Sequence, residues 1–154
     1  MARQIDPYYD SEKFKHRTLI TVRFADLDAL THVNHATYLT YMETARMEYA
    51  ADVWGWDRNM ANLKMIVATA EVVYFAPLAL GDMVVVYTRL ARLGTKSFDL
   101  AYIIRRVENN VEGQLVATGK TAMVGFDYTA NQTIPVDDSW RQRSMTYETA
   151  LEVT

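Results

Sequence analysis

The chain has 154 residues, 50% of them hydrophobic and 23% charged, and its formal net charge is -3. This composition is typical of a globular domain with one hydrophobic core and excludes a disordered chain. The lack of a basic excess argues against nucleic acid as a partner. The sequence has no cysteine, which excludes disulfides, thiolate metal sites and a cysteine nucleophile. It shows no signal-peptide core and no apolar run of membrane-spanning length, so we expect a cytoplasmic protein without a membrane partner.

The N-terminal part of the chain divides into a tail and a strand. Residues 1–15 mix charges with Pro7 and show no hydrophobic period, which predicts a tail on the surface or against a partner subunit. From His16 the pattern changes, and apolar and polar residues alternate as far as Phe24. Alternation of this kind predicts a strand with one buried face.

A long amphipathic helix is predicted from Asn34 to about Trp54. Its apolar face is marked by side chains at steps of three and four residues, namely Tyr38, Met42, Ala45, Tyr49 and Val53. Asn34 is a suitable N-cap, because its side-chain oxygen can accept a hydrogen bond from the first turn, and Gly55 can take the left-handed conformation that ends a helix. At 1.5 Å per residue the helix is roughly 30 Å long, enough to cross a domain.

Four further β-rich segments follow the helix and are joined by short connections. They are residues 65–75, 83–93, 97–107 and 114–128. Short connections imply antiparallel neighbours, and a single sheet buries a lone long helix against one face. We therefore predict an α+β fold in which five antiparallel strands curl around a central helix. Residues 1–154 are expected to form one domain, with a C-terminal extension, residues 129–154, that contains a short helix.

A cluster of polar residues lies between the first strand and the helix. Residues 26–35 contain two aspartates, two histidines and an asparagine. Asp28 lies six residues before the Asn34 cap, close enough for the loop to fold back over the start of the helix. Free N–H groups and the helix dipole attract negative charge there, including charge that develops during a reaction. The cluster therefore predicts a catalytic carboxylate that faces an oxyanion site.

A family resemblance is carried by residues 28–39, DALTHVNHATYL, and residues 43–46, ETAR. These motifs resemble the signature of hotdog-fold acyl-CoA thioesterases of the 4-hydroxybenzoyl-CoA thioesterase-like family. The resemblance implies that an acyl-CoA is hydrolysed to a carboxylic acid and free coenzyme A, with Asp28 as the catalytic carboxylate. It also implies that the backbone N–H near His35 polarises the thioester carbonyl. One departure is Thr31, where the family usually has glycine.

The resemblance also bears on cofactors and assembly. It implies no cofactor, because coenzyme A is part of the substrate and a carboxylate with electrostatic stabilisation is sufficient for an activated thioester. It implies a homo-oligomer, either a dimer or a tetramer, with the active sites at the subunit interface. The sequence leaves the acyl group open.

Each candidate site residue has a structural alternative. Asp28 is a general base or a nucleophile in the catalytic interpretation, and it forms an Asx-turn in the structural one. His35 supplies its backbone N–H or its imidazole, or is an exposed residue at the start of the helix. Asn34 and Tyr38 are candidate substrate-binding residues, with helix capping and core packing as their alternatives. Asp26 is a weaker candidate that could equally shape the turn.

Three alternatives compete with thioester hydrolysis. Asp28, His32 and His35 offer two imidazoles and a carboxylate to a metal ion, but their spacing is loose and no fourth ligand is evident, so we predict no metal site. A hotdog-fold enoyl-CoA hydratase or dehydratase would pair a histidine with an acid. A non-catalytic acyl-CoA-binding sensor normally needs an effector domain, for which 154 residues leave little room. Glu43 and Arg46 are spaced for a local ion pair on the helix.

Overall fold

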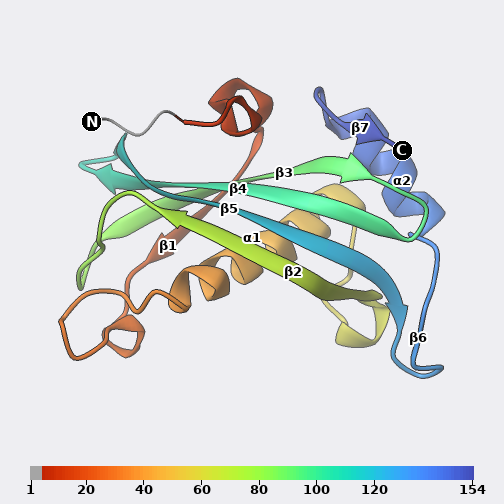
Figure 1. Cartoon of the computed structure of the whole chain (residues 1–154), viewed down its shortest axis with the longest axis horizontal. Coiled ribbons are helices and arrows are strands. Elements are labelled where there is room, and N and C mark those ends of the chain that lie inside the picture. Colours follow the sequence, from red (N-terminus) through yellow and green to blue (C-terminus); the bar gives the residue numbers. More distant parts are fainter. Residues whose placement is uncertain (1–4) are drawn as a thin grey trace.

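The computed structural model of the protein describes residues 5–154 and consists of an antiparallel sheet packed on a long helix (Figure 1). The helix, α1, spans Thr37–Trp54 and lies against one face of the sheet. The main strands follow the spatial order β1-β3-β4-β5-β2. Their bounds are His16–Thr21 for β1, Met65–Tyr74 for β2, Met83–Leu93 for β3, Ser97–Glu108 for β4 and Val111–Asp127 for β5. The predicted α+β hotdog arrangement is confirmed.

Shorter elements complete the fold at its edges. The two-residue strands β6 (Gln132–Thr133) and β7 (Glu152–Val153) pair with β5 and β3. The helix α2 (Asp138–Tyr147) lies in the C-terminal extension, where the sequence predicts a short helix. Single-turn 3-10 helices are found at η1 (Pro7–Tyr9), η2 (Ser11–Lys13), η3 (Phe24–Asp26) and η4 (Met60–Asn62). No helix within residues 5–154 is long and apolar enough to cross a membrane.

The core lies between α1 and the sheet. The predicted apolar face of the helix is buried throughout, at Tyr38, Met42, Ala45, Tyr49 and Val53. The helix approaches β5 closely at Gly119, where an added Cβ would lie 2.3 Å from the Met42 Cε atom. The end of the helix agrees with the prediction, since Gly55 has a φ of 71° and its N–H donates to the Ala50 carbonyl.

Two predicted strand boundaries are wrong by more than one residue. β1 ends at Thr21, because the chain then turns into η3 and leaves the Phe24 side chain 80% exposed. β5 begins at Val111, earlier than predicted, because Asn109 and Asn110 have φ values of 50° and 62° and close a two-residue hairpin turn. In both cases a local turn replaces the pattern on which the prediction was based.

The N-terminal segment lies on the face of the sheet opposite α1 (Figure 1). Phe14 packs there with Ala101 and Ile103, and the Tyr8 and Tyr9 rings join the same cluster. Residues 5–15 therefore cover part of the outer face of the sheet. Residues 1–4 of the predicted tail lie outside the described residues.

Candidate active site

Residues 26–34 form a narrow hairpin between β1 and α1. Its two arms pair through backbone hydrogen bonds, from the Asn34 N–H to the Asp26 carbonyl (2.9 Å) and from the Asp28 N–H to the His32 carbonyl (2.9 Å). This pairing ties the residues before the helix to the foot of the hairpin. Asp28 lies at the opposite end, next to the tip.

The Asp28 carboxylate is half-exposed and only partly engaged. Its Oδ1 atom accepts a hydrogen bond from the Leu30 N–H at 2.8 Å, which is the Asx-turn of the structural alternative. The Oδ2 atom has no hydrogen-bond donor or cation partner within residues 5–154. One carboxylate oxygen thus shapes the tip of the hairpin, and the other is available to water or to a ligand.

The tip itself is strained at Thr31. This residue has a φ of 64°, in the left-handed region that favours glycine, and its N–H donates to the Asp28 carbonyl at 3.0 Å. The family's usual glycine at this position is explained by that conformation. Thr31 follows the same backbone path, but as a β-branched residue it does so at a cost in conformational energy.

Asp26 anchors the foot of the hairpin to α1. Its side chain is 3% exposed and accepts hydrogen bonds from the Tyr41 hydroxyl (2.8 Å), the Arg23 N–H (2.9 Å) and the Arg23 guanidinium (2.9 Å). Burial alone would raise the pKa of Asp26, but these hydrogen bonds outweigh it and lower the pKa below its ordinary value.

The start of α1 differs from the prediction. The helix begins at Thr37, three residues later than predicted, and the side chain of Asn34 does not cap it. Instead, Asn34 Oδ1 accepts from the Ala36 N–H (2.9 Å) and the Asn34 carbonyl accepts from the Thr37 N–H (2.9 Å), so a separate turn precedes the helix. Within residues 5–154 the His35 N–H has no acceptor, and His35 is exposed. An amide donor is therefore free at this turn.

Tyr74 holds this turn from the sheet and was not predicted from the sequence. It is the last residue of β2, and its hydroxyl donates to the His35 carbonyl at 2.6 Å. Its ring packs edge-on against Tyr38, with ring centroids 5.0 Å apart. Tyr38 itself is 3% exposed, so in the single chain its ring packs in the core. No local pattern signals the Tyr74 contact, because its partners lie far back in the sequence.

A second loop, residues 75–82, braces the outer part of the hairpin. The Val33 N–H donates to the Leu78 carbonyl at 2.9 Å. His32 and Ala79 form a β-bridge one step further out. The hairpin is thus supported on one side by α1 and on the other by this loop.

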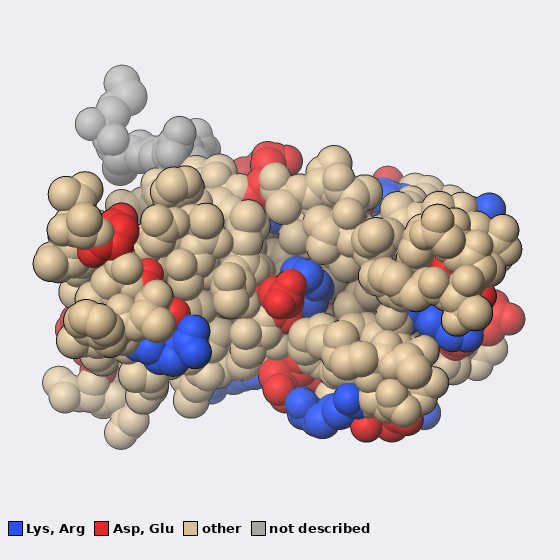
Figure 2. Space-filling view, turned by 90° about the horizontal axis from the view of Figure 1, so that it is seen from below, with Lys and Arg blue, Asp and Glu red and all other residues tan. Residues whose placement is uncertain are grey.

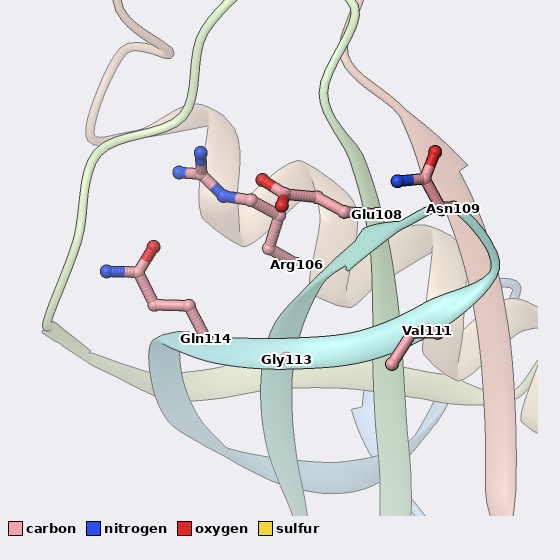
Figure 3. Close-up of a pocket in the computed structure, with 6 residues that line it drawn as sticks. All are labelled: Arg106, Glu108, Asn109, Val111, Gly113 and Gln114. Atoms are coloured by element: carbon pink, nitrogen blue, oxygen red, sulfur yellow. The ribbon is translucent and has the colours of Figure 1, made fainter.

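Arg106 of β4 fixes the bracing loop to the sheet. Its guanidinium donates to the Pro77 carbonyl at 2.5 Å and lies 3.5 Å from the Asp82 carboxylate. Figure 3 shows Arg106, Glu108 and Gln114 around a hollow of about 430 Å³ beside this loop. Asp28 and His35 do not line this hollow. We therefore assign Arg106 a structural role and do not place it at the reacting centre.

A groove runs along α1 beside the edge strand β2. Two hollows of about 350 Å³ and about 200 Å³ share the residues Glu43, Arg46 and Val67. The predicted ion pair is formed there, with 3.3 Å between Glu43 and Arg46. The larger hollow is otherwise mainly apolar and is lined by Met47, Met60, Leu63, Met65 and Met123, among others. Figure 2, which looks from below at the side where α1 lies in Figure 1, shows a largely uncharged face that is hollowed near its middle.

The metal site considered as an alternative has no cluster of ligands in the described part of the chain. Residues 5–154 contain no group of three or more histidine, cysteine, aspartate or glutamate side chains placed to hold a metal ion. Asp28, His32 and His35 are spread over the tip, the second arm and the turn before the helix. The groups that the site offers are a carboxylate oxygen and a backbone amide.

The register of the hairpin limits the distance between these two groups. Asp28 is level with His32 on the opposite arm, about 5 Å away, and His35 lies three residues further along, so the Cα atoms of Asp28 and His35 are at most about 12 Å apart. A thioester held between a carboxylate at attack distance and a hydrogen-bonding amide requires at most about 8 Å between the carboxylate oxygen and the amide nitrogen. The free Asp28 oxygen and the free His35 N–H are therefore candidates for binding the same carbonyl group.

Fold and site together define a hotdog protein with a carboxylate in front of a helix start, and comparison with known proteins gives the family. The family model of the thioesterase-like superfamily matches residues 22–143. The chain therefore belongs to the thioesterase-like superfamily. This confirms the family resemblance and the enzyme class, thioester hydrolase, that the sequence predicts.

Individual relatives agree with this assignment. The chain is 29% identical over 129 residues to the long-chain acyl-CoA thioesterase FadM of Escherichia coli (strain K12), covering 82% of this chain and 95% of FadM. A thioesterase from Thermus thermophilus, complexed with coenzyme A and Zn, is 32% identical with a TM-score of 0.75, covering 88% of this chain and 95% of that chain. A predicted thioesterase from Bacillus stearothermophilus is 25% identical with a TM-score of 0.75, and the match covers 87% of this chain and 96% of that chain.

Proposed function

We propose that the protein hydrolyses an acyl-CoA thioester to a carboxylic acid and free coenzyme A, with Asp28 as the catalytic carboxylate. The observation that carries this proposal is the hairpin, which has a free carboxylate oxygen on Asp28 and, three residues beyond the residue opposite it, the free N–H of His35. The relatives support the substrate class, because FadM is named for long-chain acyl-CoA and the Thermus thermophilus enzyme holds coenzyme A.

In the proposed reaction the thioester carbonyl oxygen accepts a hydrogen bond from the His35 N–H. As a general base, Asp28 removes a proton from water while the water oxygen attacks the carbonyl carbon. The amide and the positive end of α1 stabilise the negative charge that develops on the carbonyl oxygen. The carbon–sulfur bond then breaks, and the coenzyme A thiolate takes up the proton from Asp28.

A nucleophilic route uses the same geometry. Asp28 attacks the carbonyl carbon itself, the thiolate leaves, and the mixed anhydride that results is hydrolysed by water. Both routes need the free carboxylate oxygen and the amide of His35. They differ in whether the carboxylate becomes covalently bound, which rapid quenching of a single turnover followed by mass spectrometry detects.

The proposal includes a homo-oligomer formed through the edge strand β2. Within residues 5–154, β2 pairs with β5 on one side only, and its side chains Ile66 and Val67 are 38% and 41% exposed. An open apolar edge favours pairing with a second strand. In a two-fold antiparallel pair, the Tyr74 end of one β2 lies beside the Met65 end of the other. The apolar hollow of one copy then faces the helix start of its partner.

This arrangement also suggests the acyl group. Four methionines line the larger hollow, and methionine side chains adapt to flexible apolar ligands. We therefore propose an aliphatic acyl chain, with the hollow of the second copy as its binding site. Val67→Lys places like charges close to the proposed seam, so we expect this variant to elute as a monomer in size-exclusion chromatography and to lose activity.

The decisive experiment is a thiol-release assay with a panel of saturated acyl-CoA substrates of increasing chain length. Wild-type protein should release coenzyme A, and Asp28→Asn should lower kcat by about 100-fold to 10,000-fold while its circular dichroism stays that of the wild type. Glu12→Gln serves as the matched control, because Glu12 is an exposed carboxylate on the outer face of the sheet. Activity of Asp28→Asn close to that of Glu12→Gln would refute the role of Asp28.

The same assay distinguishes the alternatives. A hydratase or dehydratase would convert an enoyl-CoA without releasing thiol from the saturated substrate. An acyl-CoA sensor would bind the substrate tightly in a calorimeter and release no thiol. Either result contradicts the proposed hydrolysis.

A further inference from the structure

The peptide unit between His35 and Ala36 is held at both ends. Its carbonyl oxygen accepts the Tyr74 hydroxyl at 2.6 Å, and its N–H donates to Asn34 Oδ1 at 2.9 Å. The free His35 N–H belongs to the peptide unit immediately before it. Fixing the plane of the His35–Ala36 peptide unit therefore restricts the orientation of the Asn34–His35 peptide unit and its N–H, because only the two backbone dihedrals of His35 lie between these planes.

Tyr74 is itself held rigidly enough to act as an anchor. Its backbone belongs to β2, which pairs with β5 up to this residue, at Ala117. Its ring packs edge-on against the buried ring of Tyr38. Tyr74 is 41% exposed, and its hydroxyl is protonated at neutral pH like that of any ordinary tyrosine, so it donates its hydrogen bond there. The anchor thus links the helix start to the sheet.

We propose that Tyr74 is a positioning residue for the oxyanion site, whose hydroxyl holds the His35 carbonyl and thereby directs the His35 N–H toward the substrate carbonyl. The inference rests on the proposed function, since it assigns Tyr74 a part in the same reaction. Tyr74 acts through the backbone and need not touch the substrate. Without its hydroxyl the turn keeps only the bonds made by Asn34, and the His35 peptide gains freedom to rotate.

The expected effect lies in turnover and not in substrate binding. The amide bonds the oxyanion most strongly in the transition state, so its misplacement lowers kcat more than it changes KM. Removing an oxyanion donor altogether lowers kcat by about 100-fold to 1,000-fold, and misplacing a group by about 1 Å lowers it by up to about 100-fold. Tyr74→Phe should therefore lower kcat by about 10-fold to 100-fold and leave KM within about threefold of the wild type.

The matched control is Tyr87→Phe. Tyr87 lies on β3, is half-buried, and also donates its hydroxyl to a protein acceptor, the Glu112 carboxylate, on the outer face of the sheet. Both variants remove one hydroxyl and keep the ring, so a general loss of stability would affect them alike. Amide hydrogen exchange of the peptide that contains residues 34–38 is the second measurement, and it should become faster in Tyr74→Phe only.

The outcomes separate this inference from the proposed function. If wild-type protein releases thiol and Asp28→Asn does not, but Tyr74→Phe matches Tyr87→Phe in kcat, the positioning role is overturned while the function stands. A rise in KM with kcat unchanged also overturns it, because that result indicates a substrate contact. If wild-type protein releases no thiol from any acyl-CoA, the proposed function fails, and unchanged exchange at residues 34–38 in Tyr74→Phe overturns the anchoring independently.

Discussion

Replacing Thr31 with glycine should stabilise the protein, although most substitutions by glycine destabilise. The threonine has a φ of 64°, and the left-handed conformation costs a non-glycine residue about 1 to 2 kcal/mol. Glycine removes that cost, but it increases the entropy of the unfolded chain by about 0.4 to 1 kcal/mol. The net expectation is a gain of about 0.5 to 1 kcal/mol in the free energy of unfolding, or about 1 to 4 °C in Tm for a chain of this size.

Two further variants make the test specific. Ala29 lies in the same hairpin tip without a positive φ, so Ala29→Gly should lower the free energy of unfolding by about 0.4 to 1 kcal/mol. Gly81 has a φ of 82° with no atom near an added Cβ, so Gly81→Ala should destabilise through backbone strain alone. Urea unfolding followed by circular dichroism measures the free energy of unfolding of all three variants. The reasoning about strain is refuted if Thr31→Gly is no more stable than the wild type.

Three other predictions concern the helix start, the core and the C-terminal extension. His35→Ala should keep kcat within about threefold, because the proposed role uses the backbone N–H; a loss of about 100-fold in the thiol-release assay would instead assign the role to the imidazole. Gly119→Ala should lower the free energy of unfolding by about 1 to 3 kcal/mol in urea, because its Cβ would overlap the Met42 side chain, whereas Gly113→Ala has only one neighbouring atom, at 3.9 Å, and should cost less. Burial raises the pKa of Glu148 in the folded protein even though Tyr49 and the Leu90 N–H donate hydrogen bonds to it. The stabilisation from protonated Glu148 is therefore fully present at pH values below the pKa of this group in the unfolded chain, and it is lost as the pH rises through the pKa in the folded protein. Glu148→Gln keeps the accepting oxygen without the charge, so it should melt at a higher temperature than the wild type at pH 7, and calorimetry at pH 4 should show that difference diminished or absent.

The sequence determined the order of the elements and the position of the candidate catalytic motif. Alternation and three-to-four spacing depend on residues close together in the chain, and they placed β3 correctly, the end of α1 at Trp54 and the turn at Gly55. The signature from Asp28 to Leu39 gave the family. Local reasoning failed at Asn34, where a separate turn precedes the helix, and at Phe24, where η3 ends the alternating pattern.

The tertiary structure alone decided how the candidate site is held. Tyr74 meets His35 across 39 positions, and Tyr41 meets Asp26 across 15. These contacts depend on the register of β2 against β5 and on the way α1 packs on the sheet. Periodicity assigns a residue to an element and to a face of that element, but it does not specify which distant residue it will meet. That pairing is fixed only when the close-packed core selects one arrangement of helix and sheet.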